Sequence, residues 1–130
     1  MDSCASGKPK ILVMKYTGKD CSFSNNPQSR KHRCHGDPLF TDPVFILATD
    51  KKRKRTWFKG LVALDGLFDI AATNAGRTKL ASDTLVKIYT DDPDEGGVLL
   101  QRIKFHTSCS KPLNVGDVFG SLELVTFTAE

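Results

Sequence analysis

Short apolar runs separated by turn residues constrain the fold of this chain most strongly. The runs lie at residues 9–17, 43–50, 56–64, 67–73, 84–90, 98–107 and 117–129. Apolar-polar alternation is typical of β-strands, and Gly, Pro, Asn and Asp between the runs are typical of turns. No stretch has the sustained period of an amphipathic helix. The pattern therefore predicts an all-β fold, an Ig-like antiparallel β-sandwich of about seven or eight strands.

Turn signals and large apolar side chains complete the predicted fold. Asp65–Gly66 and the acidic sequence at 91–97 predict turns, and residues 76–83 predict a helical turn or loop. Residues 18–42 form a long polar excursion. The side chains expected to fill the core are Leu12, Met14, Phe45, Leu47, Trp57, Leu61, Phe68, Ile70, Val86, Ile88, Ile103, Phe105, Phe119 and Leu122.

The length of 130 residues is that of one domain. Residues 1–8 are small and polar and predict a flexible N-terminal lead-in, so we assign the single β-sandwich domain to residues 9–130. The hydrophobic fraction of 39% excludes wholesale disorder. No apolar run approaches the roughly 20 residues of a transmembrane helix, so no membrane span is expected.

Four cysteines, Cys4, Cys21, Cys34 and Cys109, permit two disulfides. Cys21 and Cys34 flank a polar stretch that buries little apolar surface, and a disulfide closing such a loop contributes about 3 kcal/mol. Cys4 and Cys109 would then tie the lead-in to the segment before the last strand. The connectivity stays open, and free or metal-bound thiols are the alternative. Disulfides would imply an oxidising, extracellular compartment.

Five consecutive basic residues, Lys51, Lys52, Arg53, Lys54 and Arg55, stand between two predicted strands. The net charge is +4, and without this run the chain would be slightly acidic. One interpretation is a solvated hairpin tip. The other is a site for an anionic partner such as a glycan or polymer, with Trp57 nearby. Nucleic acid is not the expected partner, because the charges do not spread along a face between aromatic residues.

Catalytic and cofactor motifs are missing from the sequence, so we expect no enzyme, no cofactor and no metal. His106 and Cys109 would need an orienting group to act as a base and a nucleophile. The spacing of His32, Cys34 and His35 is too tight for a usual zinc loop. Calcium at the acidic turn is a weaker alternative than a plain turn, because Pro93 and Glu95 break the usual ligand spacing.

Two strings near the ends of the chain resemble a known family. FHTSCSKPLNVGDVFGSLEL, at residues 105–124, is similar to the C-terminal signature of an uncharacterised domain family found in large secreted and surface proteins of cyanobacteria and other aquatic bacteria. KPKILVMKYTGKDC, at residues 8–21, resembles the opening of that family. The resemblance covers most of the chain and implies a secreted β-sandwich module with no established activity.

The resemblance extends to single residues inside the chain. Trp57, Phe58, Gly60 and Val62 are similar to a mid-chain strand of the family, and its cysteines look matched at Cys21, Cys34 and Cys109. The basic run 51–55 departs from the ordinary polar turns of the members. A ligand shared with the family at this hairpin is therefore not implied.

Two functions are compatible with these observations. The first is a non-catalytic structural subunit, repeated head-to-tail with other copies of itself in a fibre or matrix at the cell surface. Residues 122–128 are apolar on both faces and would pair with a neighbouring copy, and Cys4 bonded to Cys109 of that copy would add a covalent link. The alternative is an extracellular binding module for an anionic glycan or polymer, using residues 51–55.

Overall fold

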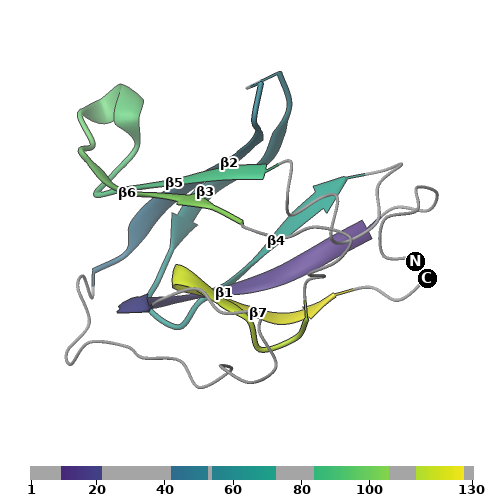
Figure 1. Cartoon of the computed structure of the whole chain (residues 1–130). Helices are drawn as coiled ribbons and strands as arrows, with labels where there is room; N and C mark the ends of the chain where they lie inside the picture. The colour runs from purple at the N-terminus through teal and green to yellow at the C-terminus, as the bar shows by residue number, and fades with distance from the viewer. Residues whose placement is uncertain (1–9, 22–41, 53, 73–83, 106–113, 128–130) are drawn as a thin grey trace.

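The computed structural model describes residues 10–21, 42–52, 54–72, 84–105 and 114–127, which form two packed antiparallel sheets (Figure 1). One sheet, sheet A, has the order β4-β1-β7, and the other, sheet B, has the order β3-β2-β5-β6. The strands are β1 (Lys10–Cys21), β2 (Val44–Asp50), β3 (Thr56–Val62), β4 (Leu67–Ala72), β5 (Thr84–Tyr89), β6 (Leu99–Lys104) and β7 (Val118–Phe127). The predicted all-β sandwich is confirmed.

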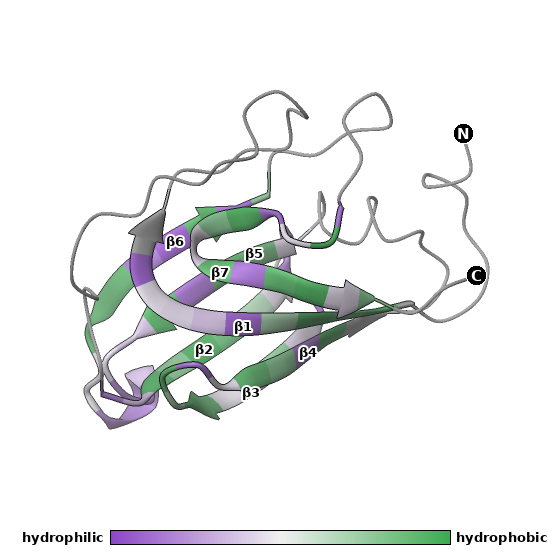
Figure 2. Cartoon of the chain, turned by 90° about the horizontal axis from the view of Figure 1, so that it is seen from below, coloured by the Kyte–Doolittle hydropathy of each residue, from purple (hydrophilic) through white to green (hydrophobic). Residues whose placement is uncertain are grey.

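Strand β1 is the central strand of sheet A. It pairs antiparallel with β4 on one side and with β7 on the other (Figure 2). Leu12, Met14 and Tyr16 alternate along β1 and are almost completely buried. Because successive side chains of a strand point to opposite faces, these three define the face that packs against sheet B. The strand extends to Cys21, beyond the predicted end at residue 17.

The core lies between the inner faces of the two sheets, and most of the predicted core residues are buried. Leu61 is the clear exception, because 62% of it is exposed, so its assignment to the core is wrong. The residues of the buried cluster are Leu12, Met14, Tyr16, Val44, Ile46, Ala48, Val62, Phe68, Ile70, Val86, Ile88, Ile103, Phe105, Phe119, Leu122 and Leu124.

The face of β2 that packs in the core is opposite to the one predicted from the sequence, which contains Phe45 and Leu47. Val44, Ile46 and Ala48 belong to the core cluster. Phe45 and Leu47 alternate with them and therefore point to the outer face of sheet B. Both faces of β2 are apolar, so alternation alone offers two equally good assignments. Leu47 is only half-buried, and its predicted place in the core is wrong.

The turn predicted at Asp65–Gly66 carries the chain from one sheet to the other. Asp65 has φ 62°, and the N–H of Gly66 donates to the carbonyl of Ala63 over 2.8 Å. The Asp65 N–H donates to the carbonyl of Tyr16, and the Tyr16 N–H donates to the carbonyl of Gly66. These bonds attach the turn to β1, at the point where the chain passes from β3 in sheet B to β4 in sheet A.

Several predictions concern residues whose structure is not described. They include the lead-in 1–8, residues 76–83, most of the excursion 18–42 and Arg53. In the part of the chain that is described, no helix has the length and apolar character needed to cross a membrane.

Candidate anion-binding face

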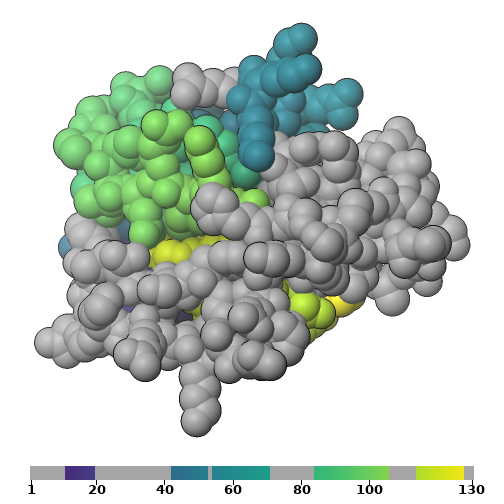
Figure 3. All heavy atoms as spheres, viewed as in Figure 1, coloured from purple at the N-terminus to yellow at the C-terminus, as the bar shows by residue number. Residues whose placement is uncertain are grey.

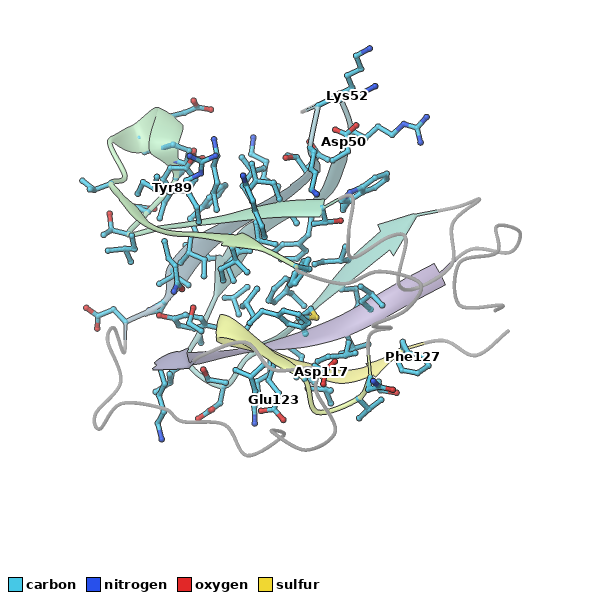
Figure 4. All side chains as sticks on the ribbon, in the orientation of Figure 1. Asp50, Lys52, Tyr89, Asp117, Glu123 and Phe127 are labelled. Carbon is cyan, nitrogen blue, oxygen red and sulfur yellow. The ribbon has the colours of Figure 1, made fainter. Side chains whose placement is uncertain are left out.

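The basic hairpin, which we define as residues 51–55 between β2 and β3, is folded around one carboxylate. Asp50 Oδ1 accepts hydrogen bonds from the backbone N–H groups of Lys54 at 2.6 Å and Arg55 at 2.9 Å. The Asp50 N–H donates to the carbonyl of Arg55 over 3.0 Å. Hydrogen bonds to a carboxylate acceptor are the stronger kind, so Asp50 ties Lys54 and Arg55 to the end of β2 (Figure 4).

The cations of the basic hairpin point to solvent. Lys51, Lys52, Lys54 and Arg55 are all exposed. The hairpin projects from the surface beyond the end of sheet B (Figure 3). The sequence thus predicted the hairpin correctly, but it did not reveal the role of Asp50 at its base.

Trp57 does not join these cations. The strand pairing between β2 and β3 shifts next to Trp57, where Ala48 pairs with Phe58 and Thr49 pairs with Thr56. A bulge of this kind leaves one residue without a partner in the ladder and re-aims its side chain. Trp57 packs against the core cluster, and no described residue accepts a hydrogen bond from its buried Nε1. Its predicted place beside an anionic ligand therefore has no support in the packing.

A row of basic residues crosses the outer face of sheet B. Leu47 on β2 lies opposite Lys59 on β3 and Lys87 on β5. Lys87 in turn lies opposite Arg102 on β6. Residues directly opposite each other in an antiparallel sheet point to the same face, so these four side chains share the face of Phe45 and Leu47. Lys59 and Arg102 are exposed, and Lys87 is half-buried.

A shallow cavity of about 330 Å³ lies over this part of the outer face. Its lining combines two apolar residues, two lysines and two threonines with two residues from the connection between β5 and β6. The lining residues are Phe45, Leu47, Thr49, Thr56, Lys59, Lys87, Pro93 and Asp94. The cavity therefore combines polar and cationic residues with apolar ones.

An acidic turn stands at the opposite end of sheet B from the basic hairpin (Figure 1). It contains the short 3-10 helix η3 (Pro93–Glu95), and the Asp92 side chain accepts from the N–H of Asp94 over 2.9 Å. Asp91 Oδ1 likewise accepts from the N–H of Asp92 over 2.8 Å. Two of the acidic side chains thus hold the turn itself, which is the plain-turn interpretation of this sequence.

Of the other predicted site residues, the structure describes only Cys21. His32, Cys34, His35, Cys4, His106 and Cys109 lie outside the described residues. Cys21 is the last residue of β1, where its backbone pairs with Gly120. In the residues that are described, no group of His, Cys, Asp or Glu side chains is arranged to hold a metal ion.

Burial raises the pKa of the Tyr16 hydroxyl above its ordinary value of 10.0. The cause is the loss of solvation, which disfavours the ionised form of a buried group. Tyr16 belongs to the core cluster, on the inner face of sheet A. This shift is thus a property of the core and not of the candidate face.

Sequence reasoning missed the basic row because its members are far apart in the chain. Lys59, Lys87 and Arg102 stand singly in three strands, and only the strand register brings them together. Alternation gave no clear signal either, because Lys59 alternates with Leu61, and Lys87 with Leu85 and Tyr89.

Comparison with known proteins gives a family without an assigned activity. No curated protein and no solved structure matches the chain significantly. Residues 8–127 match a family described as a domain of unknown function, DUF7467. This match agrees with the expectation that the chain belongs to an uncharacterised domain family. The chain therefore belongs to the DUF7467 family, of which it forms one β-sandwich domain.

Proposed function

We propose that this chain is a non-catalytic extracellular module that binds an anionic polymer through its basic hairpin. The observation that carries the proposal is the arrangement of the hairpin: Asp50 accepts hydrogen bonds from the N–H groups of Lys54 and Arg55, while the side chains of Lys51, Lys52, Lys54 and Arg55 are exposed. A site whose backbone is ordered before binding loses less conformational entropy when the ligand arrives. Clustered cations of this kind attract a polyanion in a salt-dependent way.

Neutralising part of the hairpin is expected to weaken polymer binding. The double variant K51Q/K52Q should bind dextran sulfate about 30-fold more weakly than the parent chain, because each basic residue near an anionic surface contributes about 1 kcal/mol. Isothermal titration at low and at physiological salt measures the effect. Uncharged dextran, as the polymer control, should not bind.

The matched control for this experiment is K15Q/K19Q. It removes the same amount of positive charge from β1, on the other sheet. Equal weakening in both double variants would show that only net charge matters and would refute the hairpin as a site. Binding that does not change with salt would refute it as well.

A second candidate function, self-assembly into a surface fibre or matrix, is favoured by the edge strand β6. Strand β6 is the last strand of sheet B, and its outer edge pairs with no other described strand. Leu99 and Leu100 at its start are 43% and 44% exposed, and Val98 just before them is 64% exposed. An exposed edge with apolar side chains is suited to pairing with a strand of another copy.

The structure gives the terminal strand a partner in its own chain. Strand β7 pairs with β1 along one edge, and Leu122 and Leu124 are fully buried in the core. These apolar side chains of β7 are therefore already buried within one molecule. For this reason we place the assembly contact of the second candidate at β6.

If the second candidate function is correct, a charge at the β6 edge should block assembly. The variant L100K is expected to remain monomeric at concentrations where the parent chain forms a ladder of oligomers in native mass spectrometry. V115K is the control, because Val115 is 53% exposed but lies in a turn outside the strands. A parent chain that is strictly monomeric at high concentration would rule out this function. Non-reducing electrophoresis separates disulfide-linked from strand-linked oligomers.

A further inference from the structure

The basic row on the outer face of sheet B has dimensions that suit an extended ligand. Lys59 and Lys87 are separated by one intervening strand, which places their backbones about 10 Å apart, and Arg102 lies on the next strand, about 5 Å further. The row is therefore about 15 Å long and runs across the strands. A compact anion would contact one of its cations, whereas an extended chain would contact all of them.

The basic row lies close to the basic hairpin on the same sheet. Leu47, at the centre of the row, is three residues before Asp50 along β2, a distance of about 10 Å. On β6, Lys104 lies level with Thr49 along the strands, because it pairs with Leu85, whose other neighbour is Thr49. The positive charge therefore extends from the hairpin across the width of sheet B.

Three cations of this face are available for a ligand. Lys59, Arg102 and Lys104 are exposed, and none of them forms an ion pair with a residue in the described ranges. By contrast, Lys15 on sheet A forms an ion pair with Glu123, in which Nζ lies 3.9 Å from Oε1. Unpaired cations that gather on one face create a local positive potential that attracts an anion.

The acidic turn limits the path that such a ligand can take. Asp94 closes the end of the cavity that is farthest from the basic hairpin. An anionic chain that ran along the strands would reach Asp94 and its neighbours and be repelled there. A chain that crosses the strands on the hairpin side avoids this repulsion.

From these features we infer that the outer face of sheet B binds a linear anionic polysaccharide, which lies across the strands over Lys59, Lys87 and Arg102 and continues onto the basic hairpin. This inference rests on the proposed anion-binding function and names its ligand class. Sugars carry hydroxyl groups, and two residues with hydroxyl groups, Thr49 and Thr56, line the cavity together with Lys59 and Lys87.

The aromatic residues of this face favour a polysaccharide over a nucleic acid. Single-stranded nucleic acids bind by stacking their bases on exposed aromatic side chains. Phe45 is only 6% exposed, and it packs edge-on against Tyr89 with their ring centres 6.5 Å apart. Phe45 therefore offers no open platform beside the basic row, and Tyr89 is partly buried.

The test compares two double variants that remove the same charge from opposite sheets. K59Q/R102Q, in the row, should weaken binding of length-defined sulfated oligosaccharides by about 30-fold. K15Q/K19Q, on sheet A, should change binding little. Inorganic sulfate should not compete at equal charge, because it cannot span the row. Thermal unfolding of both variants verifies that the exposed substitutions leave the fold intact.

Each outcome bears on a different part of the inference. If K59Q/R102Q behaves like K15Q/K19Q while K51Q/K52Q loses affinity, the row is not part of the site, although the proposed function stands. If polyphosphate or single-stranded DNA binds more tightly than the sulfated oligosaccharide, the ligand class is wrong. If no polyanion binds the parent chain, the inference and the proposed function are both overturned.

Discussion

Replacement of Phe119 by alanine is expected to lower the free energy of unfolding by about 3–5 kcal/mol. Phe119 on β7 is 1% exposed, and its ring meets that of Phe105 edge-on, with the centres 4.6 Å apart and the planes at 85°. Phe105 directly follows β6, so this aromatic pair joins sheet A to sheet B. The substitution would leave a cavity between the sheets, and the lost aromatic contact adds to the cost.

Urea denaturation followed by circular dichroism measures this loss. The control is Leu61→Ala, which truncates a side chain that is 62% exposed and should change the stability by less than about 0.5 kcal/mol. Equal losses in the two variants would contradict the assignment of the core to the inner faces.

The second large effect is expected at Asp117, whose replacement by alanine should cost about 3 kcal/mol. Asp117 is fully buried, and its Oδ2 accepts a hydrogen bond from the N–H of Asn114 over 2.9 Å. Its backbone N–H donates to the carbonyl of Asn114, and its carbonyl accepts from the N–H of Leu124. The alanine variant would leave a donor of the turn without this acceptor and would loosen the start of β7.

Denaturation together with amide hydrogen exchange at Asn114 and Leu124 tests this role. Asp117→Asn retains an acceptor oxygen and should lose less stability than the alanine variant. Glu123→Gln, which removes a partly exposed carboxylate from the same strand, should have almost no effect, because exposed ion pairs contribute little. A fully protected Asn114 amide in the alanine variant would refute the role of the Asp117 carboxylate.

The fold could be predicted from the sequence because alternation and turn residues act locally. The run at 84–90 became β5 (Thr84–Tyr89), and Asp65–Gly66 formed its turn. In strand β2, local alternation was not enough to predict which face is buried. Its two faces are equally apolar, and the choice between Ile46 and Leu47 for the core was made by pairing with β3 and β5. Alternation carries no information about such long-range contacts.

The candidate site was only partly predictable for the same reason. The basic hairpin was found from the sequence, because its basic residues are consecutive and stand between two predicted strands. The basic row was not found, because Lys59 and Arg102 share a face only through the register of four strands. Asp50 was also missed, since an acidic residue before a basic run gives no sign that it accepts hydrogen bonds from the backbone of that run.

The position of β1 at the centre of sheet A has a consequence for how the chain acquires its structure. Strand β1 cannot complete its pairing until β7 is present, because Leu12 pairs with Phe127 and Tyr16 with Leu122. During synthesis, the ladder groups on that side of β1 and much of its apolar face stay without their native partners until residues 118–127 emerge. Folds dominated by such distant pairings form slowly. The chain loses the entropy of closing a long loop before the stabilising contacts between the strands can form. The nascent chain thus passes through a period of vulnerability to aggregation that the finished domain does not share.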